Sequence, residues 1–193
     1  MVKSVSPELK ETIAKAIAEA ERRTSAEVVV VVLPASDPYQ SHLMSYGLAL
    51  GSLIGMGLWT EKIVTGFPVL FGIQVAAIMA MLFVPFLGSL CLKLIPKRVM
   101  HHHAARRAFE EFLIVSRHVP AERPVVILYI SLAERYVHVL HSRAILQKVP
   151  NEAWEAVVQE FTALMKKSSL QEACDAAIQR ITRTLEPCFP VNR

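Results

Sequence analysis

A long stretch almost without charge constrains this chain more than any other feature. The 55 residues from Pro38 to Leu92 contain only two charged side chains, Glu61 and Lys62, although the 193-residue chain holds 21 Lys and Arg and 17 Asp and Glu. This pair divides the stretch into uncharged runs of 23 and 30 residues. Apolar runs of about 20 residues are long enough to cross a bilayer as helices. The sequence therefore predicts two transmembrane helices and excludes a disordered chain or a simple soluble globule.

The two predicted spans form a hairpin. We expect the first at 42–60 and the second at 67–95, and the segment between them is long enough only for a turn. The second apolar run exceeds what a bilayer needs, which predicts a tilt or a bend at Pro85. Basic residues follow the second span, whereas the turn offers only Lys62 beside Glu61. The positive-inside rule therefore places both termini in the cytoplasm.

Small residues recur at every fourth position in both spans. Such stripes allow helix backbones to approach each other in lipid, so we expect them to pack inside the hairpin, with a homodimer as the alternative. The stripes are Gly47, Gly51 and Gly55 in the first span and Gly72, Ala76 and Ala80 in the second. Neither span carries an acidic side chain, which favours an anchor over a channel or transporter.

The charged remainder predicts one α/β domain in two pieces, 1–37 and 97–193. Each piece is too small to hold a core alone, so we expect them to fold together, with the hairpin inserted after the first strand. Apolar patterns predict strands at 28–33, 125–130 and 136–140, and helices at 7–23 and 97–117. In the helix at 97–117 we expect Phe109, Phe112 and Leu113 to face inward. Two further helices should follow, one capped by Asn151 and one capped by Ser169 together with Glu172.

The cysteines indicate a reducing compartment, and the first residues indicate that the chain is not secreted through a signal peptide. Cys91, Cys174 and Cys188 are odd in number and show no CxxC spacing, which argues against a disulfide framework and a zinc knuckle. The segment 1–23 is charged and amphipathic, so we expect no secretory signal peptide.

Several segments of the sequence resemble one known family. ERRTSAEVVVVVL at 21–33 resembles the opening of the TPM domain, and RAFEEF, VVILYISLAERYVHVL, VPNEAW and LEPCFP are similar to the bacterial membrane branch of that family. The resemblance covers most of 7–37 and 100–190. It implies a three-layer α/β/α sandwich with a membrane hairpin, placed in the bacterial inner membrane.

The same resemblance implies two kinds of activity. Some relatives, among them thylakoid-lumen proteins linked to photosystem II repair, are associated with acid-phosphatase activity and bind calcium through acidic loop residues, and others are accessory subunits of membrane proteins. In the bacterial branch an Asp-x-Gly-Ile turn usually follows the third strand, but here the matching residues are Ser142, Arg143, Ala144 and Ile145. Because calcium prefers carboxylate ligands, we expect no metal, no cofactor and no catalytic role at this turn.

The histidines and basic residues near the second span have a simpler interpretation than metal or nucleic-acid binding. Three adjacent imidazoles on one helix, His101 to His103, cannot converge on one ion, so we expect a polar collar beside the membrane, with metal binding or pH sensing as alternatives.

The basic cluster carries no interleaved aromatic residues and is typical of a topology signal near anionic lipids. We therefore expect no nucleic acid as a partner. The cluster comprises Lys97, Arg98, Arg106 and Arg107.

Four side chains flank the predicted strands and are candidates for ligand binding: Glu27, Glu134, Arg135 and His141. The alternative for the first three is an exposed ion pair at a strand end. No motif of a known catalytic class occurs. We therefore expect a membrane-anchored, non-catalytic interaction or accessory module, whose partners are the bilayer and a membrane protein or a second copy. The alternative is a weak, calcium-linked phosphatase that uses Glu27, Glu134 and His141.

Overall fold

The computed structural model describes residues 7–63, 66–84, 94–120 and 123–191. The chain divides into two units, one made of Met1–Ser36 with His101–Arg193 and the other of Asp37–Met100.

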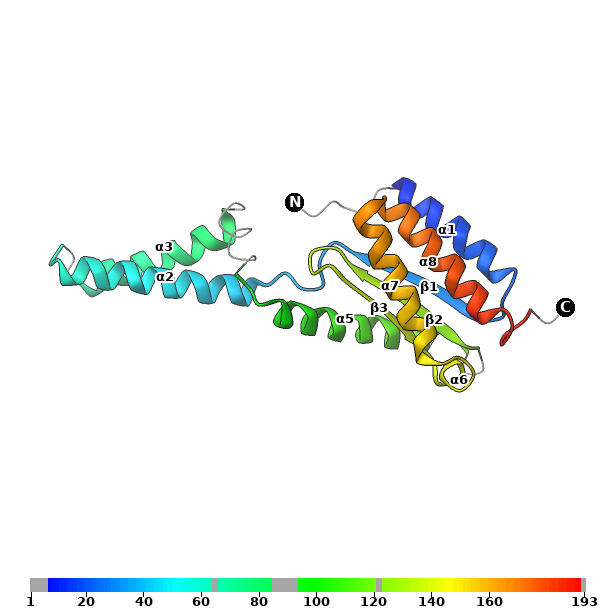
Figure 1. The fold of residues 1–193 in the computed structure, drawn as a ribbon. Helices are drawn as coiled ribbons and strands as arrows, with labels where there is room; N and C mark the ends of the chain where they lie inside the picture. The colour runs from blue at the N-terminus through cyan, green and yellow to red at the C-terminus, as the bar shows by residue number, and fades with distance from the viewer. Residues whose placement is uncertain (1–6, 64–65, 85–93, 121–122, 192–193) are drawn as a thin grey trace. The chain divides into compact units, whose positions relative to one another are not determined.

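The first unit is built on a three-stranded sheet of order β1-β2-β3 (Figure 1). Its strands are β1 (Glu27–Leu33), β2 (Val125–Ser131) and β3 (Tyr136–His141). β1 runs parallel to β2, and β3 pairs with β2 in the antiparallel sense. Every residue of β2 is buried, as expected for an apolar, β-branched strand at the centre of a sheet. The three strands lie close to the positions that the sequence predicts.

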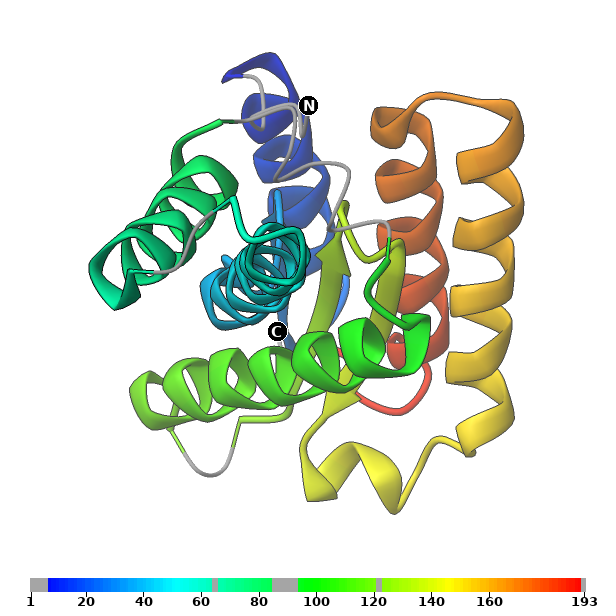
Figure 2. The same ribbon diagram turned by 90° about the vertical axis from the view of Figure 1, so that its left-hand side faces the viewer.

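Helices cover both faces of this sheet, which confirms a mixed α/β fold. One face carries α1 (Pro7–Glu21), α7 (Asn151–Lys167) and α8 (Leu170–Leu185), and the other face carries α5 (Lys97–His118) (Figure 1). α7 and α8 run side by side (Figure 2). The short helix α6 (Arg143–Leu146) follows β3 and buries Ile145 completely.

The inward face of α5 differs from the prediction. Phe109 and Leu113 were expected inside, but their exposed fractions are 53% and 41%. Ala104 and Ala108 are buried instead, and Phe112 packs beside them as predicted. The sheet presents bulky side chains on this face, and small residues allow the helix to approach them closely.

The starts of α7 and α8 differ in how they are capped. Ser169 caps α8, because its hydroxyl accepts a hydrogen bond from the backbone N–H of Glu172 at 3.2 Å, as predicted. Asn151 does not cap α7: the N-cap residue is Pro150, which offers no side-chain acceptor, and Asn151 is the first residue of the helix. The predicted cap at Asn151 is therefore wrong by one position.

The second unit contains two apolar helices, α2 (Gln40–Thr60) and α3 (Phe67–Phe83), packed against each other (Figure 1). Among the described residues, α2 is the helix that is both long enough and apolar enough to cross a membrane, and α3 is a shorter apolar helix. The predicted second span continued to residue 95. Residues 85–93, with the bend expected at Pro85, lie outside the described residues.

One small-residue stripe lies at the contact between α2 and α3, and the other does not. A Cβ added to Gly47 would lie 2.7 Å from the Cα of Ile78, and one added to Gly51 would lie 2.9 Å from the Cα of Gln74. Gly55 is also buried. In α3, a Cβ on Gly72 would meet nothing within 4 Å, Ala76 is exposed and Ala80 is only half-buried. The contact face of α3 is rotated away from the expected stripe.

Candidate ligand pocket at one end of the sheet

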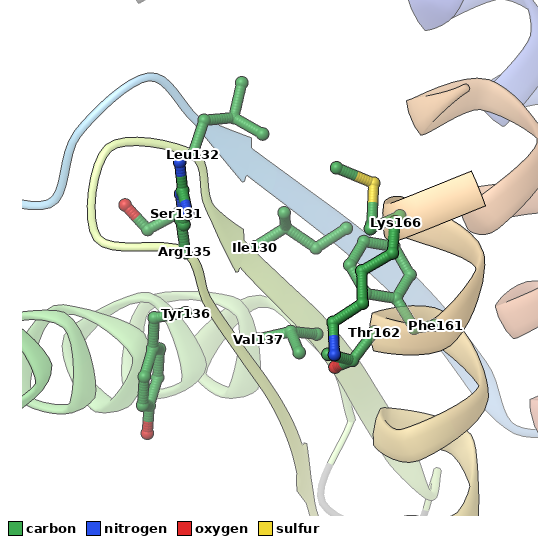
Figure 3. A pocket seen from close by; sticks show the side chains of 10 residues that line it. Ile130, Ser131, Leu132, Arg135, Tyr136, Val137, Phe161, Thr162 and Lys166 are labelled. Carbon is green, nitrogen blue, oxygen red and sulfur yellow. The ribbon is translucent and has the colours of Figure 1, made fainter. Parts of the chain in front are cut away.

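A pocket of about 500 Å³ opens where β2 ends and β3 begins. Its walls are the turn between these strands and the C-terminal half of α7 (Figure 3). The side chains of Ile130 and Val137 point from the sheet toward Phe161 on α7, whereas Tyr136 points toward α5 (Figure 3). The full lining comprises Ile130, Ser131, Leu132, Arg135, Tyr136, Val137, Phe161, Thr162, Met165 and Lys166. A pocket of this size is in the range of small-molecule sites.

The location agrees with a general property of α/β sheets. β1 and β2 are parallel and end in register at Leu33 and Ser131, beside the pocket. In open α/β sheets, ligands tend to bind outside the carboxyl ends of the parallel strands. The pocket lies at that end.

Arg135 reaches the pocket through an unusual backbone conformation. Its φ is 50°, in the left-handed region, and its N–H donates to the carbonyl of Leu132 at 3.4 Å, which closes the turn. A non-glycine residue in a sparsely populated backbone region costs about 1–3 kcal/mol. The side chains of the two adjacent residues lie in different environments: Glu134 is buried, and Arg135 is exposed at the pocket.

The pocket joins positive charge to an apolar wall. Its two charged lining residues are Arg135 and Lys166, and no Asp or Glu belongs to the lining. Across the described parts of the chain, neither cation has a carboxylate within 4.0 Å. Two unpaired cations beside buried or half-buried apolar side chains favour a ligand with an anionic group and an apolar part.

Glu134 belongs to a buried polar network at the same turn, and this network includes Ser131 of the pocket lining. The exposed fraction of Glu134 is 5%, and its carboxylate accepts hydrogen bonds from the Ser131 hydroxyl and, at 3.0 Å, from the backbone N–H of Ser36. The hydroxyl oxygens of Ser36 and Tyr129 lie 2.8 Å apart, which continues the network. Burial raises the pKa of Tyr129, so its hydroxyl stays protonated. Glu134 therefore holds the segment that follows β1 to the turn.

Glu27 lies at the opposite end of the sheet. One of its carboxylate oxygens lies 3.0 Å from Nη1 of Arg123. The pair is partly exposed, which corresponds to the ion-pair interpretation, although the partner is Arg123 and not Arg135. Such pairs contribute little to stability.

His141 also lies at that opposite end, at the last position of β3. Its ring stacks on Trp154 of α7 with the ring centroids 5.3 Å apart. Burial lowers the pKa of His141, and burial together with the charge of His141 lowers the pKa of His138. Nδ1 of His141 and Nε1 of Trp154 are buried and have no hydrogen-bond partner in the described structure. His141 is thus a packed aromatic side chain beside a second groove, which His138 and Glu155 also line.

The four predicted ligand-binding residues do not form one site. The strand register places Glu134 and Arg135 at one end of the sheet and Glu27 and His141 at the other. A seven-residue strand spans about 20 Å, far more than one ion or phosphate can bridge. Of the four, only Arg135 lines the pocket at the carboxyl ends of the parallel strands.

The histidine run lies along the start of α5. His101 and His102 are exposed, and the His101 ring centroid lies 5.5 Å from that of Tyr136. A search of the described residues finds no group of three His, Cys, Asp or Glu side chains that could hold a metal ion.

Sequence reasoning missed Lys166 and the apolar wall of the pocket. Lys166 lies with Lys167 in the last turn of a helix, where cations are common for electrostatic reasons. Phe161 has the periodicity of a core residue and is buried. The pocket arises from the contact between a turn and a helix that begins 16 residues after it, and no local pattern encodes that contact.

Comparisons with known proteins give information on the fold. No family model matches the chain, and no curated protein matches it. Among solved structures, the chain is similar to the NMR structure of BA42 protein from the psychrophilic bacterium Bizionia argentinensis, with a TM-score of 0.57 and 13% sequence identity over 99% of this chain and 88% of that chain. At this identity the likeness concerns the fold alone.

Proposed function

We propose that this protein is a TPM-like α/β module of the bacterial inner membrane, anchored by a helical hairpin with both termini in the cytoplasm. Its role is to bind: it acts as a non-catalytic interaction or accessory module for a membrane-protein partner or a second copy. The α/β domain is the TPM-like, three-layer part, and the second unit is the anchor.

The observation that carries the proposal is the character of α2. The helix has 21 residues and would be about 31 Å long, close to the thickness of a hydrocarbon core. Gly47, Gly51 and Gly55 of α2 are buried, whereas its large apolar side chains are exposed, among them Leu53 at 63% and Met56 at 60%. Exposed apolar patches of this kind mark contact with lipid or protein.

α3 supports a hairpin rather than a single span. Large apolar side chains are also exposed along it, with Phe71 at 57%. The side-chain amide of Gln74 donates to the hydroxyl of Ser52 on α2 at 3.0 Å. Hydrogen bonds between helices and close contacts at glycine are the usual means by which helices associate in lipid.

The placement of the candidate acids supports a binding role. Glu134 is buried in a hydrogen-bond network and Glu27 is paired with Arg123, at opposite ends of the sheet. General acid–base or metal-assisted catalysis needs such groups within reach of one substrate. The pocket itself contributes cations and apolar side chains, which bind an anion without supplying a base.

Alkaline carbonate extraction of bacterial membranes tests the anchor. We expect the protein to stay in the membrane pellet, and a double variant Leu50→Arg with Leu53→Arg to lose this retention, because each Arg near a helix centre costs about 2.5–3.5 kcal/mol on insertion. Leu146→Arg is the matched control, since Leu146 is also half exposed but lies on α6. Release of the wild-type protein by carbonate would contradict the anchor.

A phosphatase assay on the detergent-purified chain tests the non-catalytic role. We expect no hydrolysis above background with or without millimolar calcium. Hydrolysis that disappears in Glu27→Ala, or in Glu134→Gln with the fold intact, would instead support the calcium-linked phosphatase.

A further inference from the structure

We infer that the pocket between the β2–β3 turn and α7 binds a single-chain amphiphile with an anionic headgroup, such as a carboxylate or phosphate monoester. The inference rests on one part of the proposed function, namely that the protein is non-catalytic and releases its ligand unchanged. It names the chemical class of the ligand, which the proposed function leaves open.

The apolar part of the ligand is indicated by the walls of the pocket. Phe161 is buried at the back, and Ile130 and Val137 extend from the sheet toward it (Figure 3). Met165, with an exposed fraction of 37%, completes the wall on the α7 side. Met side chains adapt readily to ligands of different shapes. A volume of about 500 Å³ suits a short alkyl chain rather than a folded partner.

The anionic group is indicated by the two cations. Arg135 and Lys166 come from different walls, the turn and the helix, and neither is neutralised by a carboxylate among the described residues. A guanidinium can hold a carboxylate or a phosphate through two hydrogen bonds, and a Lys ammonium adds a mobile positive charge. A cationic ligand would meet only repulsion at this site.

The backbone at Arg135 fixes where this cation lies. A left-handed residue is a common feature of the turn of a β-hairpin, and Arg135 has this conformation where its N–H closes the turn on the carbonyl of Leu132. The Arg135 side chain lines the pocket.

The test uses the full chain in nanodiscs of zwitterionic phosphatidylcholine, with ¹³C-methyl-labelled methionine. The chain has seven methionines, of which Met165 lines the pocket, so the others serve as internal references. We expect octanoate to shift the Met165 methyl resonance saturably, whereas octylamine, with the same chain and opposite charge, and acetate, with no chain, leave it unchanged.

Substitutions at the two cations separate specific binding from general partitioning of octanoate. Arg135→Asn suits the left-handed backbone, and Lys166→Gln keeps most of the side chain. We expect each to weaken octanoate binding about tenfold, which corresponds to one charge-assisted contact of about 1.4 kcal/mol. Lys167→Gln is the matched control, because Lys167 is exposed, adjacent in sequence and absent from the pocket. It should bind octanoate as the wild type does.

A second arm identifies the source of the amphiphile. Nanodiscs that contain lysophosphatidic acid, a single-chain phosphate monoester, without octanoate, are compared with those of phosphatidylcholine alone. A Met165 shift that is lost in Arg135→Asn assigns the ligand to the membrane, and a shift with octanoate alone assigns it to free carboxylates. Both results support the inference.

Three results would overturn it: no Met165 shift with either probe, equal shifts in the Arg135→Asn and Lys166→Gln variants, or an equal response to octylamine. A response to a short oligo-glutamate peptide but not to octanoate would replace the amphiphile with an acidic peptide. Chemical conversion of bound octanoate, seen in its own spectrum, would contradict the non-catalytic function while leaving the site intact.

Discussion

The carboxylate of Glu134 accepts a hydrogen bond of 3.0 Å from the backbone N–H of Ser36, a residue 98 positions earlier in the chain. The bond joins the turn after β2 to the segment that follows β1, at the point where the first unit ends. Glu134, one of the four candidates for ligand binding, is therefore hydrogen-bonded within the structure at the end of the sheet.

Glu134→Ala should destabilise the protein. It removes the acceptor of the buried Ser131 hydroxyl and of the partly buried Ser36 N–H, and an unsatisfied buried donor costs about 1–3 kcal/mol. Glu134→Gln keeps one acceptor oxygen and should cost less. The measurement is the free energy of unfolding of the purified chain in denaturant, with the exposed Glu152→Ala as control. Equal stability of Glu134→Ala and the wild type would contradict the role of the network.

Stability should fall in mild acid, and His141 should contribute to the fall. Burial lowers the pKa of His141 in the folded protein, so below the usual value of about 6.5 the unfolded chain takes up a proton more readily than the folded one. The contribution of His141 is therefore present at neutral pH and lost as the pH decreases from about 6.5.

The comparison is between the wild type and His141→Phe, which retains an aromatic ring against Trp154. Unfolding free energies at pH 7.5 and pH 5.0 give the pH dependence of each. We expect a smaller difference between the two pH values in the variant. An unchanged or larger difference would show that His141 is not the group whose protonation opposes folding.

Close helix contact in the second unit should be sensitive to a single methyl group. In Gly47→Ala the new Cβ would lie 2.7 Å from the Cα of Ile78, so the helices must separate, at a cost of about 1–3 kcal/mol. Gly57→Ala is the matched control, because an added Cβ there meets nothing within 4 Å and Ala favours helix more than Gly.

Thermal unfolding in detergent, followed by the loss of helical circular dichroism, measures both variants. We expect Gly47→Ala to unfold at a lower temperature than the wild type and Gly57→Ala at the same or a higher one. If the two variants behave alike, the contact at Gly47 does not hold the helices together.

The strands were predictable from sequence because they depend on local composition. Runs such as Val28 to Leu33 and Val125 to Ile130 favour strands at every residue, and burial of β2 on both faces follows from its unbroken apolar character. Ser169 with Glu172 is likewise a local pattern, and it forms the expected cap.

The inward face of α5 was not predictable because it depends on what the helix meets. Periodicity alone favours the large side chains Phe109 and Leu113. The sheet surface opposite is already occupied by Tyr129 and Tyr136, whose ring centroids lie 6.5 Å apart, so Ala108 fits there and Phe109 does not. The pocket has the same origin, since Arg135 and Lys166 line one pocket only when the turn and α7 are in place.

We propose that the hairpin between the two pieces of the α/β domain spans the membrane and that both pieces lie in the cytoplasm. Single cysteines at Lys10, Glu61 and Lys167, all exposed, report the side on which each lies, in a background with Cys91→Ser and Cys188→Ser. Cys174 can remain, because burial raises the pKa of its thiol to about 12 and keeps it unreactive.

The measurement is labelling by a membrane-impermeant thiol reagent in bacteria with a permeabilised outer membrane and in inverted inner-membrane vesicles. We expect the cysteine at position 61 to be labelled in the cells, and those at positions 10 and 167 to be labelled only in the inverted vesicles. Labelling of positions 10 and 167 from opposite sides of the membrane would contradict this proposal.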